Sequence, residues 1–363
     1  MPRYTNKLGF FSKLILLLNA LALLALFASY SASFVNPTFF WPTAIFGLAY
    51  PPILLANIIF VLYWLIKKPK FAIASLVAIL IGWPLMTKHI TFNSSTAAAH
   101  AADSTLRVMS YNVHLFQAIQ DKNTQTQDSV IKLVQDHQPD VLCMQEFQST
   151  VTGEQKFTEK MKKSCDFKDY YFSPANENAY HGYGHVTFSK YPIVDAGVIN
   201  DYSYGINRIV FTDIVKDQDT IRVYNVHLRS FLLQDEDKDF IKNPSGADDE
   251  KAAGKRVGRK LKDAFYYRSR QVEYLLAHFE TTKHPKLVMG DFNDTPMSFS
   301  VNTIGKNMNN AFQKKGNGWG VTHFEVFPIL QIDYIFSDYD VLDYGIIKRK
   351  FSDHYPIWAD VKL

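Results

Sequence analysis

The stretch Lys286-Leu-Val-Met-Gly-Asp-Phe-Asn-Asp-Thr-Pro296 decides the fold. The apolar run at residues 287–289 is typical of a buried strand, and Gly290 lets the backbone turn or approach a ligand closely. Asp291 and Asn293 follow, and side chains two residues apart in an extended chain point to the same side. A carboxylate and an amide placed together suit the binding of a water molecule and a phosphate oxygen. An Asx-rich turn that only closes the strand is the ordinary alternative.

Polar groups also end other expected strands. Residues 106–112 alternate and end in Asn112, and the buried strand at 141–146 ends in a carboxylate. For any single residue a structural role is the simpler explanation, so the argument depends on the combination. The residues able to bind a metal ion or a phosphate are Asn112, Glu146, His227, Asp291, Asn293, Asp333, Asp353 and His354.

The order of elements from residue 105 onward indicates the fold class. Strands are expected at 106–112, 141–146, 167–172, 186–188, 208–215, 220–228, 332–336 and 357–361, and helices at 129–137 and 265–279. The densely charged residues 232–263 are expected to form a surface excursion. Strands in runs with helices between some of them favour an α/β sandwich of two packed sheets flanked by helices.

Residues 1–88 are predicted to form a transmembrane region. Apolar segments at about 14–32, 41–66 and 71–86 are long enough, or nearly so, to cross a bilayer. Basic residues lie before the first segment and at 67–70, so the positive-inside rule places everything after the third segment outside the cytoplasm. A cleaved signal peptide ending near Ser31-Ala-Ser33 is an alternative that leaves this location unchanged. Residues 89–104 are predicted to be a flexible linker.

Charge and cysteine content narrow the function classes. The chain has 39 basic and 35 acidic residues, but residues 1–104 hold seven of the basic residues and one acid, so the remainder has a net charge of −2. That balance argues against a nucleic-acid binder, although a basic patch at 251–262 with Arg268 and Arg270 supports one locally. Cys143 and Cys165 do not make a disulfide framework, and no Cys/His pairs have zinc spacing.

Three segments together resemble a known family. Gly290-Asp-Phe-Asn293 and Ser352-Asp-His354 are the most specific, and Gly184-His-Val-Thr-Phe-Ser-Lys-Tyr-Pro-Ile193 is a third. They resemble the endonuclease/exonuclease/phosphatase (DNase I-like) superfamily over residues 105–363. The resemblance implies a four-layered α/β/β/α sandwich, here preceded by about three transmembrane helices. His185 departs from the family pattern, and no role is assigned to it.

The resemblance also implies roles. Glu146 is the implied central metal ligand, with Asn112 and Asp353 nearby, and the implied ion is Mg²⁺, with Mn²⁺ or Ca²⁺ as substitutes. The remaining implied roles are orientation or deprotonation of the attacking water by Asp291, phosphate contacts by Asn293 and His227, and charge stabilisation by His354 paired with Asp333. Asp291 and His354 both stay candidates for the general base.

The predicted function is therefore a metal-dependent phosphoesterase of phosphodiesters or phosphomonoesters. It is expected to be an integral membrane protein of a bacterial inner membrane, with the catalytic domain on the extracytoplasmic side and the bilayer as a partner. Phospholipid and nucleic acid are the candidate substrates, so an extracytoplasmic DNA- or RNA-degrading nuclease is one alternative. An inactive binding or signalling member of the family is the other. No feature of the sequence indicates a protein partner.

Overall fold

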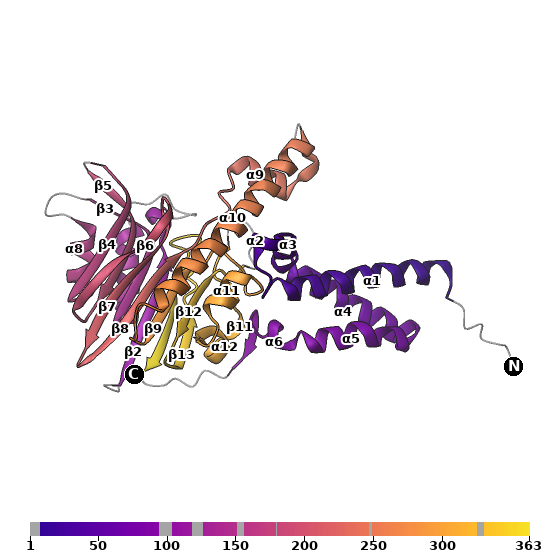
Figure 1. Ribbon diagram of the computed structural model, residues 1–363, viewed down its shortest axis with the longest axis horizontal. Helices are drawn as coiled ribbons and strands as arrows, with labels where there is room; N and C mark the ends of the chain where they lie inside the picture. Colours follow the sequence, from indigo (N-terminus) through magenta and orange to yellow (C-terminus); the bar gives the residue numbers. More distant parts are fainter. Residues whose placement is uncertain are drawn as a thin grey trace.

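The computed structural model describes residues 8–93, 104–117, 126–150, 156–178, 180–246, 249–324 and 330–363. Apolar helices at the N-terminal side extend from a larger domain built on two sheets (Figure 1). The strands are β1 (Ile90–Phe92), β2 (Thr105–Asn112), β3 (Val141–Thr150), β4 (Asp169–Glu177), β5 (His181–Ser189), β6 (Ile193–Tyr204), β7 (Asn207–Lys216), β8 (Asp219–His227), β9 (Lys286–Asp291), β10 (Asn309–Asn310), β11 (Asn317–Trp319), β12 (Asp333–Ser337), β13 (Asp340–Ile346) and β14 (Ile357–Lys362).

The helices fall into two groups. Those of the N-terminal unit are α1 (Phe10–Ser31), α2 (Pro37–Phe40), α3 (Pro42–Leu48), α4 (Tyr50–Lys67), α5 (Ala72–Ile81) and α6 (Trp83–Met86). Those of the sheet domain are α7 (Thr126–His137), α8 (Phe157–Ser164), α9 (Asp235–Lys242), α10 (Glu250–Phe279), α11 (Phe299–Ile304) and α12 (Ala311–Lys315). Short 3₁₀ turns lie at Pro69–Phe71, His114–Phe116 and Pro244–Gly246.

Two six-stranded sheets pack face to face. Sheet I has the order β13-β14-β2-β3-β5-β4, and sheet II has the order β10-β12-β9-β8-β7-β6. Their inner faces share one apolar core, in which Val108 and Cys143 of sheet I meet Val223 and Met289 of sheet II. Cys143 is therefore the buried small hydrophobe that its apolar neighbours in sequence indicate.

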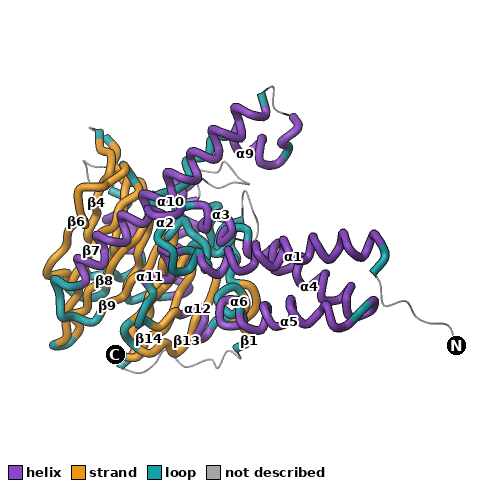
Figure 2. The backbone as a smooth tube through the Cα atoms, turned by 45° about the vertical axis from the view of Figure 1, so that its right-hand side comes forward, coloured by secondary structure: helices purple, strands orange, loops and turns teal. Residues whose placement is uncertain are grey.

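Helices cover both outer faces. The apolar stripe of α7, including Val130 and Val134, packs on sheet I with Met161 of α8. On the other side, α10 and α11 pack on sheet II through Val272, Val301 and their neighbours. Figure 2 shows α10 and α11 lying against the strands. The structure thus confirms the predicted α/β/β/α sandwich.

The expected secondary structure is most clearly wrong for the charged residues 232–263. They form α9 and the first half of α10 rather than an irregular excursion. The two helices are joined by Asp237, whose carboxylate accepts hydrogen bonds from Nε of Arg256 at 2.6 Å and Nζ of Lys260 at 2.5 Å. A tertiary ion-pair network of this kind is not visible as a local sequence pattern.

The prediction of about three membrane-spanning helices is not confirmed. Among the described residues, α1 and α4 are the two helices long and apolar enough to cross a membrane. The expected span at 41–66 is divided, because α4 begins anew at Tyr50 with Pro51 and Pro52 in its first turn, where proline is tolerated. The expected span at 71–86 is also broken, since α5 ends before Gly82 and a separate short helix follows.

Buried polar side chains join these helices. Asn19 of α1 donates a hydrogen bond to Oγ of Ser75 on α5 at 2.7 Å, and its Oδ1 accepts one from Nε1 of Trp64 on α4 at 3.0 Å. Asn57 of α4 donates to the carbonyl oxygen of Ala22 on α1 at 3.0 Å. These bonds bind α1, α4 and α5 into one bundle, as interhelical polar contacts do in membrane proteins.

The helical unit is attached directly to the sheet domain, so the linker prediction is wrong for its first residues. β1 pairs antiparallel with β11, and the backbone N–H of Gly320 donates to the carbonyl oxygen of His89 at 3.0 Å. Met297 is fully buried among the helices, and its carbonyl oxygen accepts a hydrogen bond from Oγ of Ser33 at 3.2 Å. Both figures show this junction beside α6 and α11. Residues 94–103 of the expected linker lie outside the described residues.

Candidate active site

Strand register brings the predicted residues to one end of the sandwich. In sheet II, β8 and β9 run parallel with His227 beside Asp291, and antiparallel β12 places Asp333 on the other side of Asp291. In sheet I, β2 and β3 run parallel, so Asn112 lies beside the residue that precedes Glu146. Asn112, His227, Asp291 and Asp333 therefore meet at strand ends, as the sequence predicts. The prediction is wrong for Glu146, which lies inside β3 at a bulge and not at the end of the strand.

Asn112 connects the two sheets. Its Nδ2 donates to Oε1 of Glu146 at 3.1 Å and to Oδ2 of Asp291 at 3.1 Å. Glu146 lies in a break of register between β3 and β5 and has φ of +52°, a conformation that is costly for a residue other than glycine. Its side chain is 24% exposed, whereas Asp291 is nearly completely buried. The strained bulge thus turns one carboxylate toward solvent at the site.

The loop after β9 has both properties that its sequence suggests. Gly290 has φ of +148°, and a Cβ there would lie 1.9 Å from the carbonyl oxygen of Val226, so no other residue fits. The backbone N–H of Asn293 donates to Oδ1 of Asp291 at 2.8 Å, and its Nδ2 lies 3.2 Å from Oδ2 of Asp291. This is an Asx turn, and the turn itself holds the carboxylate and amide of the site together.

Arg268 stabilises the loop that follows β9 from inside the domain. It is fully buried, its Nε donates to the carbonyl oxygen of Arg229 at 2.6 Å, and its Nη1 lies 3.2 Å from Oδ1 of Asp294. The predicted contribution of Arg268 to a basic surface patch is therefore wrong, because its charge is used inside the protein. Arg270, on the exposed side of α10, forms an ion pair with Glu273.

Asp333 and His354 form a closely coupled pair. Nδ1 of His354 lies 2.9 Å from Oδ2 of Asp333, and its Nε2 lies 3.7 Å from Oδ2 of Asp291. Burial lowers the pKa of His354, but the charges of Asp333 and Asp291 outweigh burial and hold that pKa well above 6.5. The imidazole is therefore cationic at neutral pH, and it faces the carboxylate of Asp291, the last residue of β9.

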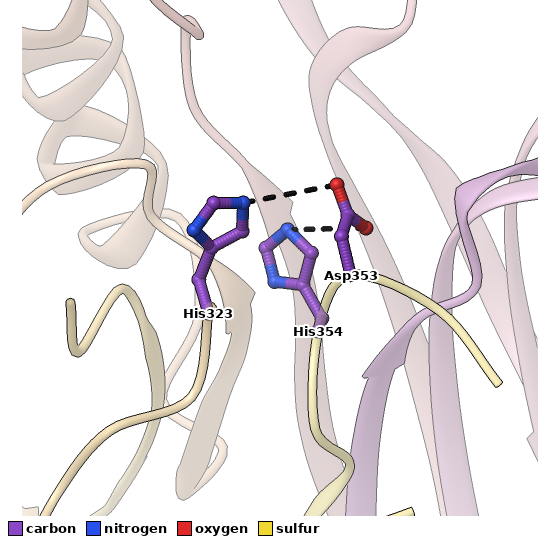
Figure 3. Close-up of side chains that lie close together, drawn as sticks. All are labelled: His323, Asp353 and His354. Atoms are coloured by element: carbon purple, nitrogen blue, oxygen red, sulfur yellow. Dashed lines mark ion pairs between the residues drawn. The ribbon is translucent and has the colours of Figure 1, made fainter. Parts of the chain in front are cut away.

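Two histidines that the sequence analysis did not predict as site residues contact Asp353. Nδ1 of His114 lies 3.2 Å from its Oδ1, and Nε2 of His323 lies 3.7 Å from its Oδ2. Figure 3 shows His323 approaching Asp353 from a separate segment, beside the ring of His354. Burial would raise the pKa of Asp353, but its close contacts with the imidazoles of His114 and His323 hold that pKa below its ordinary value.

His114 had a weak sequence signal and His323 had none. His114 is two residues after Asn112, a spacing that places two side chains together at a strand end. The backbone there adopts positive φ at three successive residues, His114, Leu115 and Phe116, which directs the imidazole back to Asp353. His323 lies in an irregular segment, and only the fold brings it to the site.

His227 is buried, although the resemblance implies that it contacts the phosphate of the substrate. It is 1% exposed, and its Nε2 lies 3.1 Å from Nδ2 of Asn207 and 3.6 Å from Oδ2 of Asp291. Burial lowers its pKa below 6.5, so the ring is neutral. The adjacent His185 is completely buried, with ring centroids 5.6 Å apart, and burial also holds its pKa well below 6.5. The structure brings His227 to the site but directs it at the carboxylates.

The donor atoms at this end suit a divalent cation. Four carboxylates meet here, from Glu146, Asp291, Asp333 and Asp353. Among the residues that the structure describes, no lysine or arginine forms an ion pair with any of them. Their partners are histidines, the amides of Asn112 and Asn293 and the hydroxyl of Ser352. Carboxylate oxygens with excess negative charge are an environment that Mg²⁺, Mn²⁺ or Ca²⁺ prefers.

Comparisons with known proteins agree with the geometry. Residues 109–354 match the endonuclease/exonuclease/phosphatase family model, and residues 12–89 match a domain of unknown function (DUF8431). No curated protein matches the chain.

Solved structures share the fold at low identity. An endonuclease/exonuclease/phosphatase from Beutenbergia cavernae has a TM-score of 0.51 and 17% identity, over 72% of each chain. Truncated Caenorhabditis elegans TDP2 has a TM-score of 0.50 and 14% identity, over 71% of this chain and 98% of that one. Because the family match spans more than half of the chain, from before Asn112 to His354, this chain belongs to the endonuclease/exonuclease/phosphatase family and is a phosphoric ester hydrolase.

Proposed function

We propose that the chain is a divalent-metal-dependent phosphodiesterase, anchored in a membrane by its N-terminal helices. The observation that carries the proposal is the contact of Asn112 with both Glu146 and Asp291, 3.1 Å in each case. It joins an oxygen-rich group on one sheet to the Asp291–Asn293 turn and the His354 imidazolium on the other. A phosphodiester resists nucleophiles because it is anionic, and this arrangement supplies opposite charge and a positioned acceptor together.

Glu146, Asn112 and Asp353 are the residues that would hold the metal ion. The ion would supply Lewis-acid stabilisation of charge on the phosphate oxygens. Glu146 is the most exposed carboxylate of the set. Its positive φ costs conformational free energy, and backbone strain of this kind is common at functional sites. His114 and His323 keep Asp353 ionised and fix its orientation.

Asp291, Asn293 and His354 act on the water and the phosphate. Asp291 is held by Asn112, Asn293 and His227, so its free lone pairs are directed, and it orients the attacking water as a hydrogen-bond acceptor. The cationic His354, supported by Asp333, stabilises the charge that grows on the phosphoryl oxygens. Asn293 is the proposed phosphate contact, and its Nδ2 would exchange one of its bonds, to the carbonyl oxygen of Leu228 at 3.1 Å or to Oδ2 of Asp291 at 3.2 Å, for one to the phosphate. His227 lies against the Asp291 carboxylate.

Removal of divalent metal from the purified full-length protein is expected to abolish hydrolysis of bis(p-nitrophenyl) phosphate. We expect EDTA to lower the rate at least about a hundredfold and excess Mg²⁺ to restore it, because the phosphate charge is then no longer compensated. The release of p-nitrophenol measures the rate, and circular dichroism checks that the fold persists in EDTA. A rate that is indifferent to EDTA contradicts metal dependence, and no rate with any divalent ion contradicts hydrolysis.

The exposed faces of α1 and α4 support membrane anchoring. Leu17, Leu24 and Phe27 of α1 are 57%, 67% and 48% exposed, and Leu62 and Ile66 of α4 are 56% and 83% exposed. Helices in the core of a soluble protein bury such residues, whereas only 11% of the most apolar part of α1 is buried. The buried Asn19 and Asn57 contacts keep α1 within the bundle, which favours a retained anchor over a cleaved signal peptide.

The proposed orientation places the sheet domain outside the cytoplasm. The basic residues at 67–70 lie between α4 and α5, at the end of the bundle far from the sheets (Figure 1). An export-dependent alkaline phosphatase fused after Leu363 is therefore expected to be active, and a cytoplasm-dependent reporter at the same place inactive. The reverse result places the active site in the cytoplasm.

One feature favours the alternative of a nuclease. Lys251, Lys255, Arg259 and Lys262 lie three or four residues apart on α10 and are all exposed, so they form one basic stripe. An anionic polymer would bind there with a strong salt dependence. Hydrolysis of DNA or RNA faster than that of any lipid phosphoester, lost when the stripe is neutralised, would favour this function.

A further inference from the structure

An apolar cavity lies where the helical unit meets the sheet domain. It has a volume of about 640 Å³, within the range of small-ligand sites. Leu55 and Ile58 of α4 form one wall, and Phe92 of β1 and Trp319 of β11 form another. Leu55, Phe92 and Trp319 are 58%, 78% and 61% exposed, which is unusual for large apolar side chains that gather at one place.

The cavity has two chemically different ends. Along α4, exposed Leu55 is followed two turns later by exposed Leu62 on the same helix face, so the apolar wall continues onto the proposed lipid-facing surface. At the other end lie Gln331 and His89. Within the described part of the chain, neither Oε1 nor Nε2 of Gln331 has a hydrogen-bond partner, nor has Nε2 of His89, although Gln331 is 4% exposed.

The fold makes room for this unpaired amide. A Cβ on Gly320 would lie 2.2 Å from Oε1 of Gln331, so the amide would have to shift if residue 320 carried a side chain. A buried amide without a hydrogen-bond partner costs desolvation free energy, and no residue in the described part of the chain compensates that cost here. A polar group of a bound molecule at this end of the cavity would satisfy the amide.

Two short segments connect the polar end to the active site. Gln331 precedes Asp333 by two residues, and Val321, which lines the cavity, precedes His323 by two. Two residues of extended chain span about 7 Å. Oγ1 of Thr322 accepts a hydrogen bond from the backbone N–H of Asp333 at 3.1 Å, so the two segments are also bonded to each other.

We propose that this cavity binds a hydrocarbon chain of a membrane lipid, and that the substrate is the phosphoester of that lipid. The proposal rests on the proposed function and names its substrate class. An acyl chain leaves the bilayer along α4 and lies between Leu55 and Trp319. The polar linkage at the head of the chain meets Gln331, and the phosphoester beyond it reaches Asp333–His354. A nucleic acid has no group that would fill the apolar part.

Photo-crosslinking tests occupancy of the cavity without relying on turnover. The full-length Glu146→Gln variant is placed in phosphatidylcholine vesicles that contain phosphatidylglycerol with a diazirine on one acyl chain. Mass spectrometry is expected to find crosslinks at residues 317–321, which belong to the sheet domain. Crosslinks confined to α1, α4 and α5 would overturn the proposal, because they report only lipid around the helices.

A matched pair of variants tests the cavity as the route. Leu55→Trp fills the cavity, and Leu62→Trp makes the same change at an equally exposed site on the same helix face outside it: Leu55 and Leu62 are 58% and 56% exposed. We expect Leu55→Trp to reduce the crosslinks at 317–321 at least about fivefold, and Leu62→Trp to leave them unchanged. Equal effects of the two variants would overturn the proposal.

Rates then separate failure of this inference from failure of the proposed function. In the otherwise wild-type protein, Leu55→Trp is expected to lower kcat/KM for phosphatidylglycerol about tenfold and to leave that for bis(p-nitrophenyl) phosphate unchanged. Hydrolysis of the soluble diester alone, with no crosslinks at 317–321, refutes the lipid substrate and retains the phosphodiesterase. Crosslinks without metal-dependent hydrolysis of either substrate refute the phosphodiesterase and retain the lipid site.

Discussion

Replacement of Glu146 by Gln is expected to lower kcat/KM for bis(p-nitrophenyl) phosphate at least about a hundredfold, equivalent to about 2.7 kcal/mol of transition-state stabilisation. The substitution keeps the shape of the side chain and the hydrogen bond from Asn112 to Oε1, which is 3.1 Å long. It removes the negative charge from the most exposed carboxylate of the site. Because the proposed metal ion depends on that charge, the Mg²⁺ concentration that gives half-maximal rate is expected to rise as well.

A control for this change lies in the same sheet. Glu177, at the end of β4, is exposed and is separated from Glu146 by the intervening strand β5, so Glu177→Gln is expected to leave the rate unchanged. Thermal unfolding of both variants is expected to match that of the wild type, because the strained backbone at residue 146 is the same with either side chain. A loss of less than about tenfold in Glu146→Gln would remove Glu146 as the principal ligand.

Loss of His354 is expected to lower kcat about a thousandfold, close to 4 kcal/mol of barrier, and subsequent loss of Asp333 to add little. Nδ1 of His354 bonds to Asp333, which orients the ring and keeps it cationic, while only Nε2 faces Asp291. Asp333 acts through the imidazole, so His354→Ala and the double variant with Asp333→Asn are expected to have similar residual rates.

The pH profile distinguishes this coupling from a structural effect. In Asp333→Asn the pKa of His354 is expected to fall, because the raising influence of Asp333 is gone while burial still lowers it. The alkaline limb of the rate profile should then move to lower pH. Asp340→Asn, at an exposed position on the next strand, is the matched control and should not move it. Losses that multiply in the double variant would show two independent residues.

The chemistry of the site was visible in the sequence because it depends on local motifs. Asp291 and Asn293 are fixed relative to each other by an Asx turn. Asp353 and His354 are neighbours in the motif Ser352-Asp-His354, so one segment contributes both to the site. Strand periodicity placed Asn112 correctly at a strand end, but it also placed Glu146 at one, whereas Glu146 lies inside β3 at a bulge. The sandwich followed from the same periodicity, since alternating runs of strands and amphipathic helices have few ways to bury their apolar faces.

What the sequence did not predict depends on contacts between distant segments. His323 reaches Asp353 only through an irregular segment, and Asp237 organises α9 and α10 by ion pairs across a loop. β1 is a strand because β11 is available to pair with it, since three residues alone give no reliable periodicity. The sequence analysis expected one continuous span at residues 41–66. In the structure the prolines lie in the first turn of a helix, where they are tolerated, and mark the beginning of a new helix.

The attachment of β1 to β11 has a consequence for biosynthesis. Asn93, directly after β1, hydrogen-bonds Gln313 from 220 positions away in the chain. On the ribosome, the helices are complete and, in the proposed topology, already inserted long before β11 exists. Both sheets also need β12 and β14, which follow β11 in the chain, so the junction with the helices and the complete sheets form only after nearly all of the chain has been made. The orientation of the sheet domain relative to the helices is therefore set only after most of the candidate site residues have been made.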